Sequence, residues 1–182
     1  MTQAPQPEAW LRGPVPGIDP FLMPAAHAIV QTRDDVTRAV TGLSTEQLWQ
    51  RPGGAASLAF HLRHIAASLD RLLTYARGEP LTDAQRAAAK RERGEEADQN
   101  AASLLEEVNA ATEAALAQLR ATSREALLEP RAVGRAAAPS NVLGLLVHAA
   151  EHSQRHAGQV VTTVKFLRAH TSSPSADREQ IP

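Results

Sequence analysis

Apolar residues recur at three- and four-residue spacing in four segments of the chain. This spacing places them on one face of a helix, and no segment carries the alternating signal of a strand. The pattern predicts an all-α protein with helices over residues 24–40, 58–76, 98–121 and about 140–169. Four amphipathic helices of this length favour a four-helix bundle, in which binding sites are built from side chains that face one another in the core.

The segments between the predicted helices differ in composition. Six prolines lie within residues 1–24, and proline favours extended backbone over helix. We therefore expect a proline-rich arm over residues 1–23, the bundle over 24–170 and a disordered tail over 171–182. Five apolar side chains are expected to anchor the arm on the bundle, and these are Trp10, Leu11, Ile18, Phe21 and Leu22.

The connection between the second and third helices, residues 82–100, is dominated by charge. We interpret its run KRERGEEAD as a solvated face or a flexible connection, with a short helix from Thr82 to Glu92, and we assign it no function. A second connection, before the fourth helix, is broken by Pro130, Gly134 and Pro139.

Composition excludes several classes of protein. The length of 182 residues suits one domain, and an aromatic content of 3% is too low for a β-sandwich or barrel of this size. The absence of cysteine excludes disulfides, thiolate metal sites and a cysteine nucleophile. A net charge of −1 argues against nucleic acid as a partner. We also expect no membrane contact and a cytoplasmic location, because there is no spanning segment and no basic apolar leader.

Five of the seven histidines fall on two predicted helices. His148, His152 and His156 repeat at a spacing of four on the last helix, which places His152 and His156 on one apolar face and His148 at its edge. Burying two imidazoles without partners is costly, and neutral imidazole nitrogens are good ligands for divalent metals. The pair therefore predicts a metal site that needs a third ligand from another helix. The second helix offers His61 or His64, and spacing alone slightly favours His61.

Two motifs resemble those of the DinB-like superfamily, which includes the YfiT-type metal-dependent hydrolases and the bacillithiol transferases. On the second helix, Ser57, the run LAFHLR, His64 and Ile65 resemble the polar cap, the mostly apolar run and the ligand histidine followed by an aliphatic residue. On the last helix, the run HSQRHAGQ that begins at His152 resembles the second motif of the family. His61 departs from the resemblance, because it stands where the family has an apolar residue.

The resemblance covers about residues 20–168 and implies a four-helix bundle of the DinB or YfiT type. It also implies that His64, His152 and His156 bind one divalent metal ion. Three imidazoles discriminate little between zinc, nickel, copper, manganese and iron, and we expect zinc or nickel, with manganese or iron as alternatives. Three histidine ligands leave positions open for water or substrate, as catalytic sites do.

The implied activity is thiol S-transfer or hydrolysis on a small-molecule substrate, with a low-molecular-weight thiol as a second cofactor and with no catalytic side chain assigned. A homodimer is also implied. The alternative is a non-catalytic, stress-related binding or interaction module whose metal site is structural or vestigial.

Three further side chains are candidates for binding a cofactor or substrate. Arg71 lies one heptad after His64 and could bind a carboxylate, although we prefer the interpretation that it is an exposed arginine paired with Asp70 or Glu79. Tyr75 could point its hydroxyl at the cavity or fill the end of the bundle. Gln159, one heptad after His152, could orient a ligand histidine or a bound water.

Overall fold

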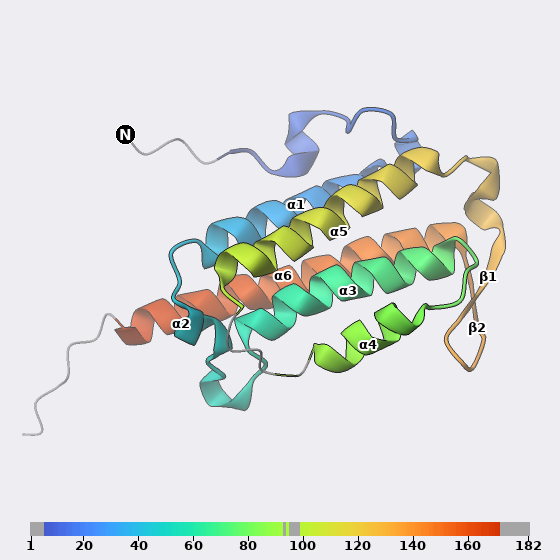
Figure 1. Ribbon diagram of the computed structural model, residues 1–182. Coiled ribbons are helices and arrows are strands. Elements are labelled where there is room, and N and C mark those ends of the chain that lie inside the picture. The colour runs from blue at the N-terminus through green and yellow to red at the C-terminus, as the bar shows by residue number, and fades with distance from the viewer. Residues whose placement is uncertain (1–5, 93, 95–98, 172–182) are drawn as a thin grey trace, which may run out of the picture.

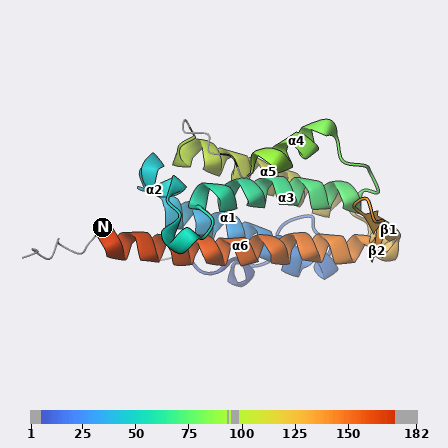
Figure 2. The ribbon, with the colours of Figure 1, turned by 90° about the horizontal axis from the view of Figure 1, so that it is seen from below.

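Four long helices form the body of the protein in a computed structural model that describes residues 6–92, 94 and 99–171. They are α1 (Met23–Val40), α3 (Leu58–Ala76), α5 (Ala101–Ala121) and α6 (Val142–Thr171). Figures 1 and 2 show them side by side along one axis, with α3 next to α6 and α1 next to both α5 and α6. The all-α bundle predicted from the apolar spacing is confirmed.

Side-chain caps account for where several of the helices begin, although α1 has none. Ser57 Oγ accepts a hydrogen bond from the Phe60 backbone N–H at 3.2 Å, which starts α3. Asn100 Oδ1 caps α5 in the same way through Ser103 N, at 3.1 Å. Capping boxes begin two shorter helices, α2 (Thr45–Trp49) and α4 (Asp83–Arg91). Short 3₁₀ turns complete the helical part, and they are η1 (Ala9–Arg12), η2 (Pro20–Leu22), η3 (Pro52–Gly54) and η4 (Glu125–Leu128).

The core is aliphatic and lies where the four long helices meet. Leu62, Ile65 and Leu69 of α3 are fully or almost fully buried. They pack into one cluster with apolar residues of the other long helices, among them Ile29, Val36, Leu104, Leu119, Leu146 and Val160. Within the described residues, no helix combines the length and the apolar character needed to cross a membrane.

A small β-hairpin is the part of the fold that the apolar pattern does not predict. β1 (Pro130–Val133) pairs antiparallel with β2 (Ala138–Asn141), with Arg131 opposite Ser140. Each strand has four residues and contains a proline, so there is too little alternation to give a sequence signal. Because the hairpin leads directly into α6, it helps to fix the position of the start of that helix.

The described part of the arm lies on the bundle, as expected. Ala9 N donates to Gln31 Oε1 of α1 at 2.7 Å, and Arg120 Nε of α5 donates to Pro16 O at 3.1 Å. Ile18 and Leu22 are buried anchors. The prediction is wrong for Trp10, Leu11 and Phe21, which are 61%, 59% and 62% exposed. Each of the two 3₁₀ turns buries only one residue, Ala9 or Leu22, and directs its neighbours outward.

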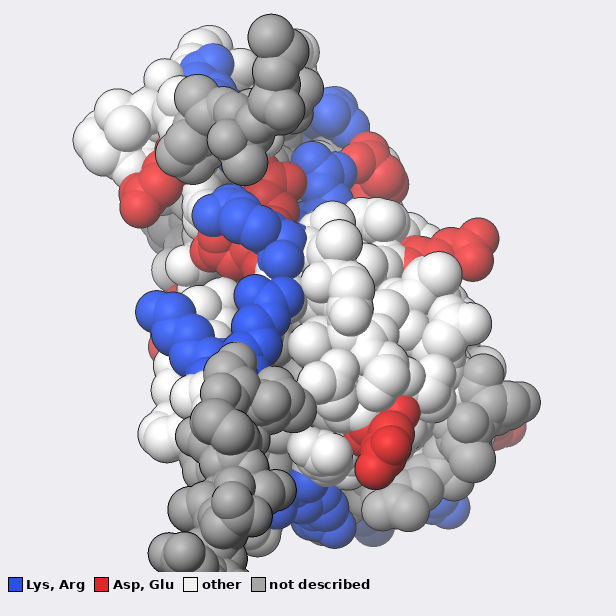
Figure 3. Space-filling model, turned by 90° about the vertical axis from the view of Figure 1, so that its left-hand side faces the viewer, with Lys and Arg blue, Asp and Glu red and all other residues white. Residues whose placement is uncertain are grey.

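The surface carries charge of both signs. In the end-on view of Figure 3, lysine and arginine side chains form a run along one side of a broad uncharged area, and acidic side chains lie on both sides of that run. No large single-sign region covers this face in the part of the chain that the structure describes, in keeping with the net charge of −1. The predicted disordered tail falls outside the described residues except for Thr171, which ends α6.

Candidate metal centre

Three histidines from two neighbouring helices meet on the inner side of α3 and α6. His64 of α3 has its Nε2 atom 2.8 Å from Nε2 of His152 on α6. The ring of His156, one helical turn further along α6, has its centroid 4.4 Å from that of His64 and 4.7 Å from that of His152. One ring nitrogen from each of the three lies within 4.8 Å of the others.

The spacing of four on α6 explains why His152 and His156 lie next to each other. Residues four apart on a helix lie on the same face, so His152 and His156 both turn toward α3. All three rings are half-buried. The structure thus brings together the three histidines that the resemblance implies, rather than the His61 set that spacing slightly favours.

His61 is buried next to His156 and is not one of the three clustered histidines. It is 5% exposed, and its Nδ1 atom is 3.0 Å from Nδ1 of His156. Burial, and then the positive charge that His64 can carry, lowers the pKa of His61 to about 4. The same two causes, in the same order, lower the pKa of His156 to about 4. Both rings are therefore neutral at neutral pH, and one donates a hydrogen bond to the other.

The donor set fits a divalent cation. Burial, and then His64, also lowers the pKa of His152, so that this ring too is neutral at neutral pH. The buried Nδ1 atom of His152 has no hydrogen-bond partner, although its other nitrogen faces His64. Neutral imidazoles that direct nitrogens toward one another match the ligands that zinc and nickel prefer.

Glu92 is a member of the site that sequence reasoning missed. Its Oε2 atom lies 2.7 Å from His64 Nδ1, and its Oε1 atom accepts a hydrogen bond from Arg71. The side chain is buried, which by itself raises the pKa of the carboxyl group, but the hydrogen bonds from His64 and Arg71 outweigh burial and lower that pKa. Glu92 is therefore ionised at neutral pH.

The pairing of Arg71 differs from both partners considered for it. Glu79 forms an ion pair with Arg77 at 2.8 Å instead, and Asp70 is exposed. Arg71 reaches the end of α4, a segment that the charge pattern suggests is only solvated. The sequence signal that could have revealed this was Arg71 itself, a charged residue among the apolar positions of α3.

Arg63 explains why this connection packs against α3. Its guanidinium group donates to Gly94 O at 2.6 Å and to Gln99 Oε1 at 2.5 Å, and it lies 4.8 Å from the ring centroid of Trp49. A buried guanidinium needs such partners. The interpretation of this segment as merely solvated is thus wrong for its described residues near α3.

A cavity of about 450 Å³ is lined by two residues that contact His64, although none of the three clustered histidines is among its lining residues. Phe60 forms part of its wall and stacks on the His64 ring, with centroids 5.5 Å apart and planes 12° apart. Glu92 also lines the cavity, which therefore reaches two residues in direct contact with His64. The remaining lining residues are Trp49, Arg51, Ala56, Ser57 and Gly94.

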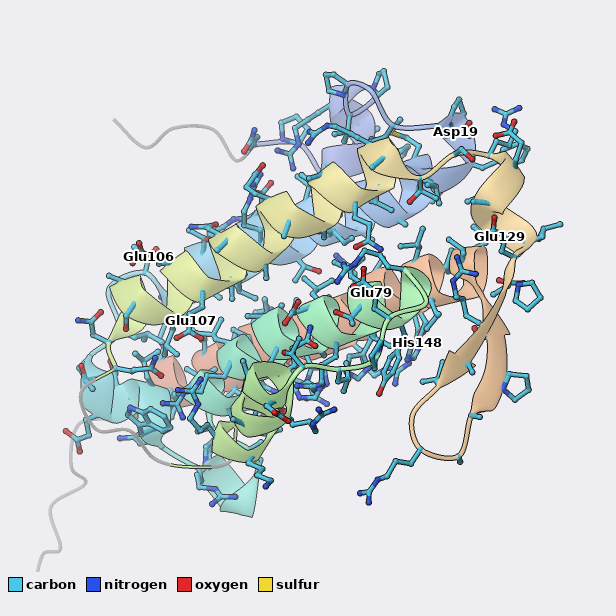
Figure 4. The ribbon with its side chains drawn as sticks, turned by 45° about the vertical axis from the view of Figure 1, so that its right-hand side comes forward. Asp19, Glu79, Glu106, Glu107, Glu129 and His148 are labelled. Atoms are coloured by element: carbon cyan, nitrogen blue, oxygen red, sulfur yellow. The ribbon has the colours of Figure 1, made fainter. Side chains whose placement is uncertain are left out.

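The other predicted site residues lie outside the cluster. Tyr75 lines a separate cavity of about 740 Å³ between α4 and the hairpin, together with Lys90 and Arg135. Gln159 is exposed on α6. His148, which Figure 4 shows between the end of α3 and the hairpin, is exposed and lies 3.1 Å from Glu151. It is not one of the three clustered histidines.

Fold and cluster together define a helical bundle with a three-histidine site between two of its long helices. The sequence model of the DinB superfamily matches residues 28–160 of the chain, a range that contains His64, His152 and His156. The chain therefore belongs to the DinB superfamily. No curated protein matches it.

Proposed function

We propose that the protein binds one divalent metal ion through His64, His152 and His156 and uses it in thiol S-transfer or hydrolysis. The observation that carries the proposal is the convergence of three ring nitrogens within 4.8 Å. Membership of the DinB superfamily supports it. The ion is expected to be zinc or nickel, with manganese or iron as alternatives.

A divalent ion held by three histidines supplies Lewis acidity that makes water or a thiol nucleophilic at neutral pH. The chain's own residues provide the surroundings. Burial keeps the imidazoles neutral, so that their lone pairs are available. Phe60 shields one face of the His64 ring.

The cavity lined by Phe60 and Glu92 supports a small-molecule substrate. Its volume of about 450 Å³ is in the range of ligand pockets, and the rings of Trp49 and Phe60 give it an apolar wall. Arg51 adds a positive charge to the lining. A low-molecular-weight thiol with an acidic group fits these walls, and so does a small organic electrophile.

A conjugation assay tests the activity. Zinc- or nickel-loaded protein is mixed with a thiol and a chromogenic electrophile, beside metal-free protein and two variants. We expect metal-dependent product from the parent and from His148→Ala, whose ring lies outside the cluster, and none from His64→Ala. Equal rates for the parent and His64→Ala would contradict the proposed activity.

A second candidate function, a non-catalytic binding module, is favoured by one observation. The histidines form two hydrogen-bonded pairs, His64 with His152 and His61 with His156, so the cluster is satisfied in part without an ion. This function predicts that removing metal lowers thermal stability, or changes nothing, and that no thiol conjugation occurs with any electrophile.

The proposal also covers the oligomeric state and the cellular location of the protein. We propose a cytoplasmic homodimer, which light scattering of the purified protein and localisation of a tagged copy would test. Among the side chains first considered for cofactor binding, Arg71 acts through Glu92, whereas the proposed reaction does not use Tyr75 or Gln159.

A further inference from the structure

We propose that Glu92 is a positioning residue that fixes the tautomer and the orientation of His64, and that Arg71 holds Glu92 in place for this purpose. The inference rests on the proposed function, since it assigns His64 as a metal ligand. It concerns a residue just after α4, which lies 28 positions along the chain from His64 but contacts it in the fold.

The contact with Glu92 determines which ring nitrogen of His64 carries the proton. An ionised carboxylate can only accept hydrogen bonds, so the 2.7 Å contact between Glu92 Oε2 and His64 Nδ1 requires a proton on Nδ1. A neutral imidazole with its proton on Nδ1 has its lone pair on Nε2. That is the atom directed at His152, 2.8 Å away, inside the cluster. Glu92 thereby selects the tautomer in which His64 can donate electrons to a metal ion.

The two carboxylate oxygens of Glu92 accept hydrogen bonds from different residues. While Oε2 accepts from His64, Oε1 accepts from Arg71, whose side chain is itself mostly buried. Arg71 thus prevents the carboxylate from rotating away and keeps it charged in a buried position. Both α3 residues, His64 and Arg71, lie one heptad apart, and Glu92 bridges them from outside.

The end of α4 is held against α3 by a further contact. Arg63 donates to Arg91 O at 3.2 Å and to Gly94 O at 2.6 Å, on either side of Glu92. The backbone that carries Glu92 is therefore attached to the same helix as His64. Pre-organisation of this kind reduces the freedom that His64 would lose on binding an ion.

Glutamine at position 92 separates this role from simple packing. It keeps the size of the side chain, but it presents one oxygen and one NH₂ group in place of two oxygens. If the oxygen turns to the positive charge of Arg71, the NH₂ group faces His64 Nδ1. A donor at that place favours the tautomer with the proton on Nε2, which blocks the metal-binding lone pair.

The test uses the full, untagged chain and zinc alone as the probe. Zinc affinity is measured by competition with a chromogenic chelator for the parent, Glu92→Gln and Arg71→Gln. Glu79→Gln is the matched control, because Glu79 also forms an ion pair with an arginine but is exposed at the end of α3 (Figure 4). Nitrogen NMR of the imidazoles reports which nitrogen of His64 is protonated, a readout that a loss of packing alone would not change.

We expect Glu92→Gln to weaken zinc binding about 10- to 100-fold and to move the His64 proton from Nδ1 to Nε2 in the metal-free protein. Arg71→Gln should weaken binding in the same direction, and Glu79→Gln should leave both readouts unchanged. Parent-like zinc affinity or an unchanged His64 tautomer in Glu92→Gln would overturn the inference. Failure of the proposed function gives another pattern, in which the parent binds no zinc or His64→Ala binds it equally well.

Discussion

Acid should destabilise the metal-free protein in a pH range set by its buried histidines. The pKa of His61 and of His156 is about 4 in the folded protein, against an ordinary value of 6.5. As pH falls below 6.5, the unfolded chain binds protons that the folded protein does not bind. The stability that these neutral histidines contribute is therefore complete above 6.5 and is lost progressively as pH approaches 4.

The magnitude follows from the same values. A pKa shift from 6.5 to about 4 corresponds to about 3 kcal/mol in the free energy of unfolding for one buried histidine. Because His156 is partly exposed, it contributes less than the buried His61. When the pH is lowered from about 7.5 to about 5, each of these two histidines should lower the free energy of unfolding by on the order of 1–2 kcal/mol. Glu92 is a smaller influence in this range, because its pKa lies below the ordinary value of 4.5.

Urea unfolding of chelator-treated protein at about pH 7.5 and pH 5 measures this loss. His61→Leu removes one titrating ring from an apolar position, so it should lose less stability between the two pH values than the parent does. His148→Gln, which changes an exposed histidine, is the control and should keep the parent's pH dependence. If His61→Leu and the parent lose equal stability, the assignment of His61 as a buried neutral ring is refuted.

Three other predictions concern stability and the cavity. Leu69→Ala should lower the free energy of unfolding by about 2–5 kcal/mol in urea titrations, because Leu69 lies in the core of α3. Ser57→Ala should lower it by about 1 kcal/mol through loss of the cap on Phe60 N, and Ser57→Asp should recover most of that loss. A thiol or electrophile that enters the cavity should change the fluorescence of Trp49 in a Trp10→Phe background, and a signal that is independent of ligand concentration would contradict that placement.

Local signals were sufficient to predict the helices. Ser57 marks the start of α3, and apolar residues recur along the faces that become buried, so the bounds of α3 and α1 agree closely with expectation. The third helix differs at its start, because α5 begins at Ala101 after the Asn100 cap, three residues later than predicted. The hairpin was missed because its strands are short and contain Pro130 and Pro139. Secondary structure that depends on pairing across a turn carries little information in each strand alone.

The site was predictable only in part, for a similar reason. His152 and His156 belong to one helix, so their common face follows from spacing. The choice between His61 and His64 depends on how α3 is rotated against α6, and spacing favoured the ring that the structure places behind the cluster. Glu92 reaches His64 from 28 positions along the chain, through a segment that Arg63 and Arg71 hold, and no periodicity encodes such a contact.

Metal content tests the central claim most directly. Untagged protein, purified without chelator and equilibrated with zinc, is analysed for metal per chain beside His152→Ala and the control His148→Ala. The account predicts about one zinc ion per chain in the parent and in His148→Ala, and a large loss in His152→Ala. No bound metal in the parent, or the same content in His152→Ala, would contradict it.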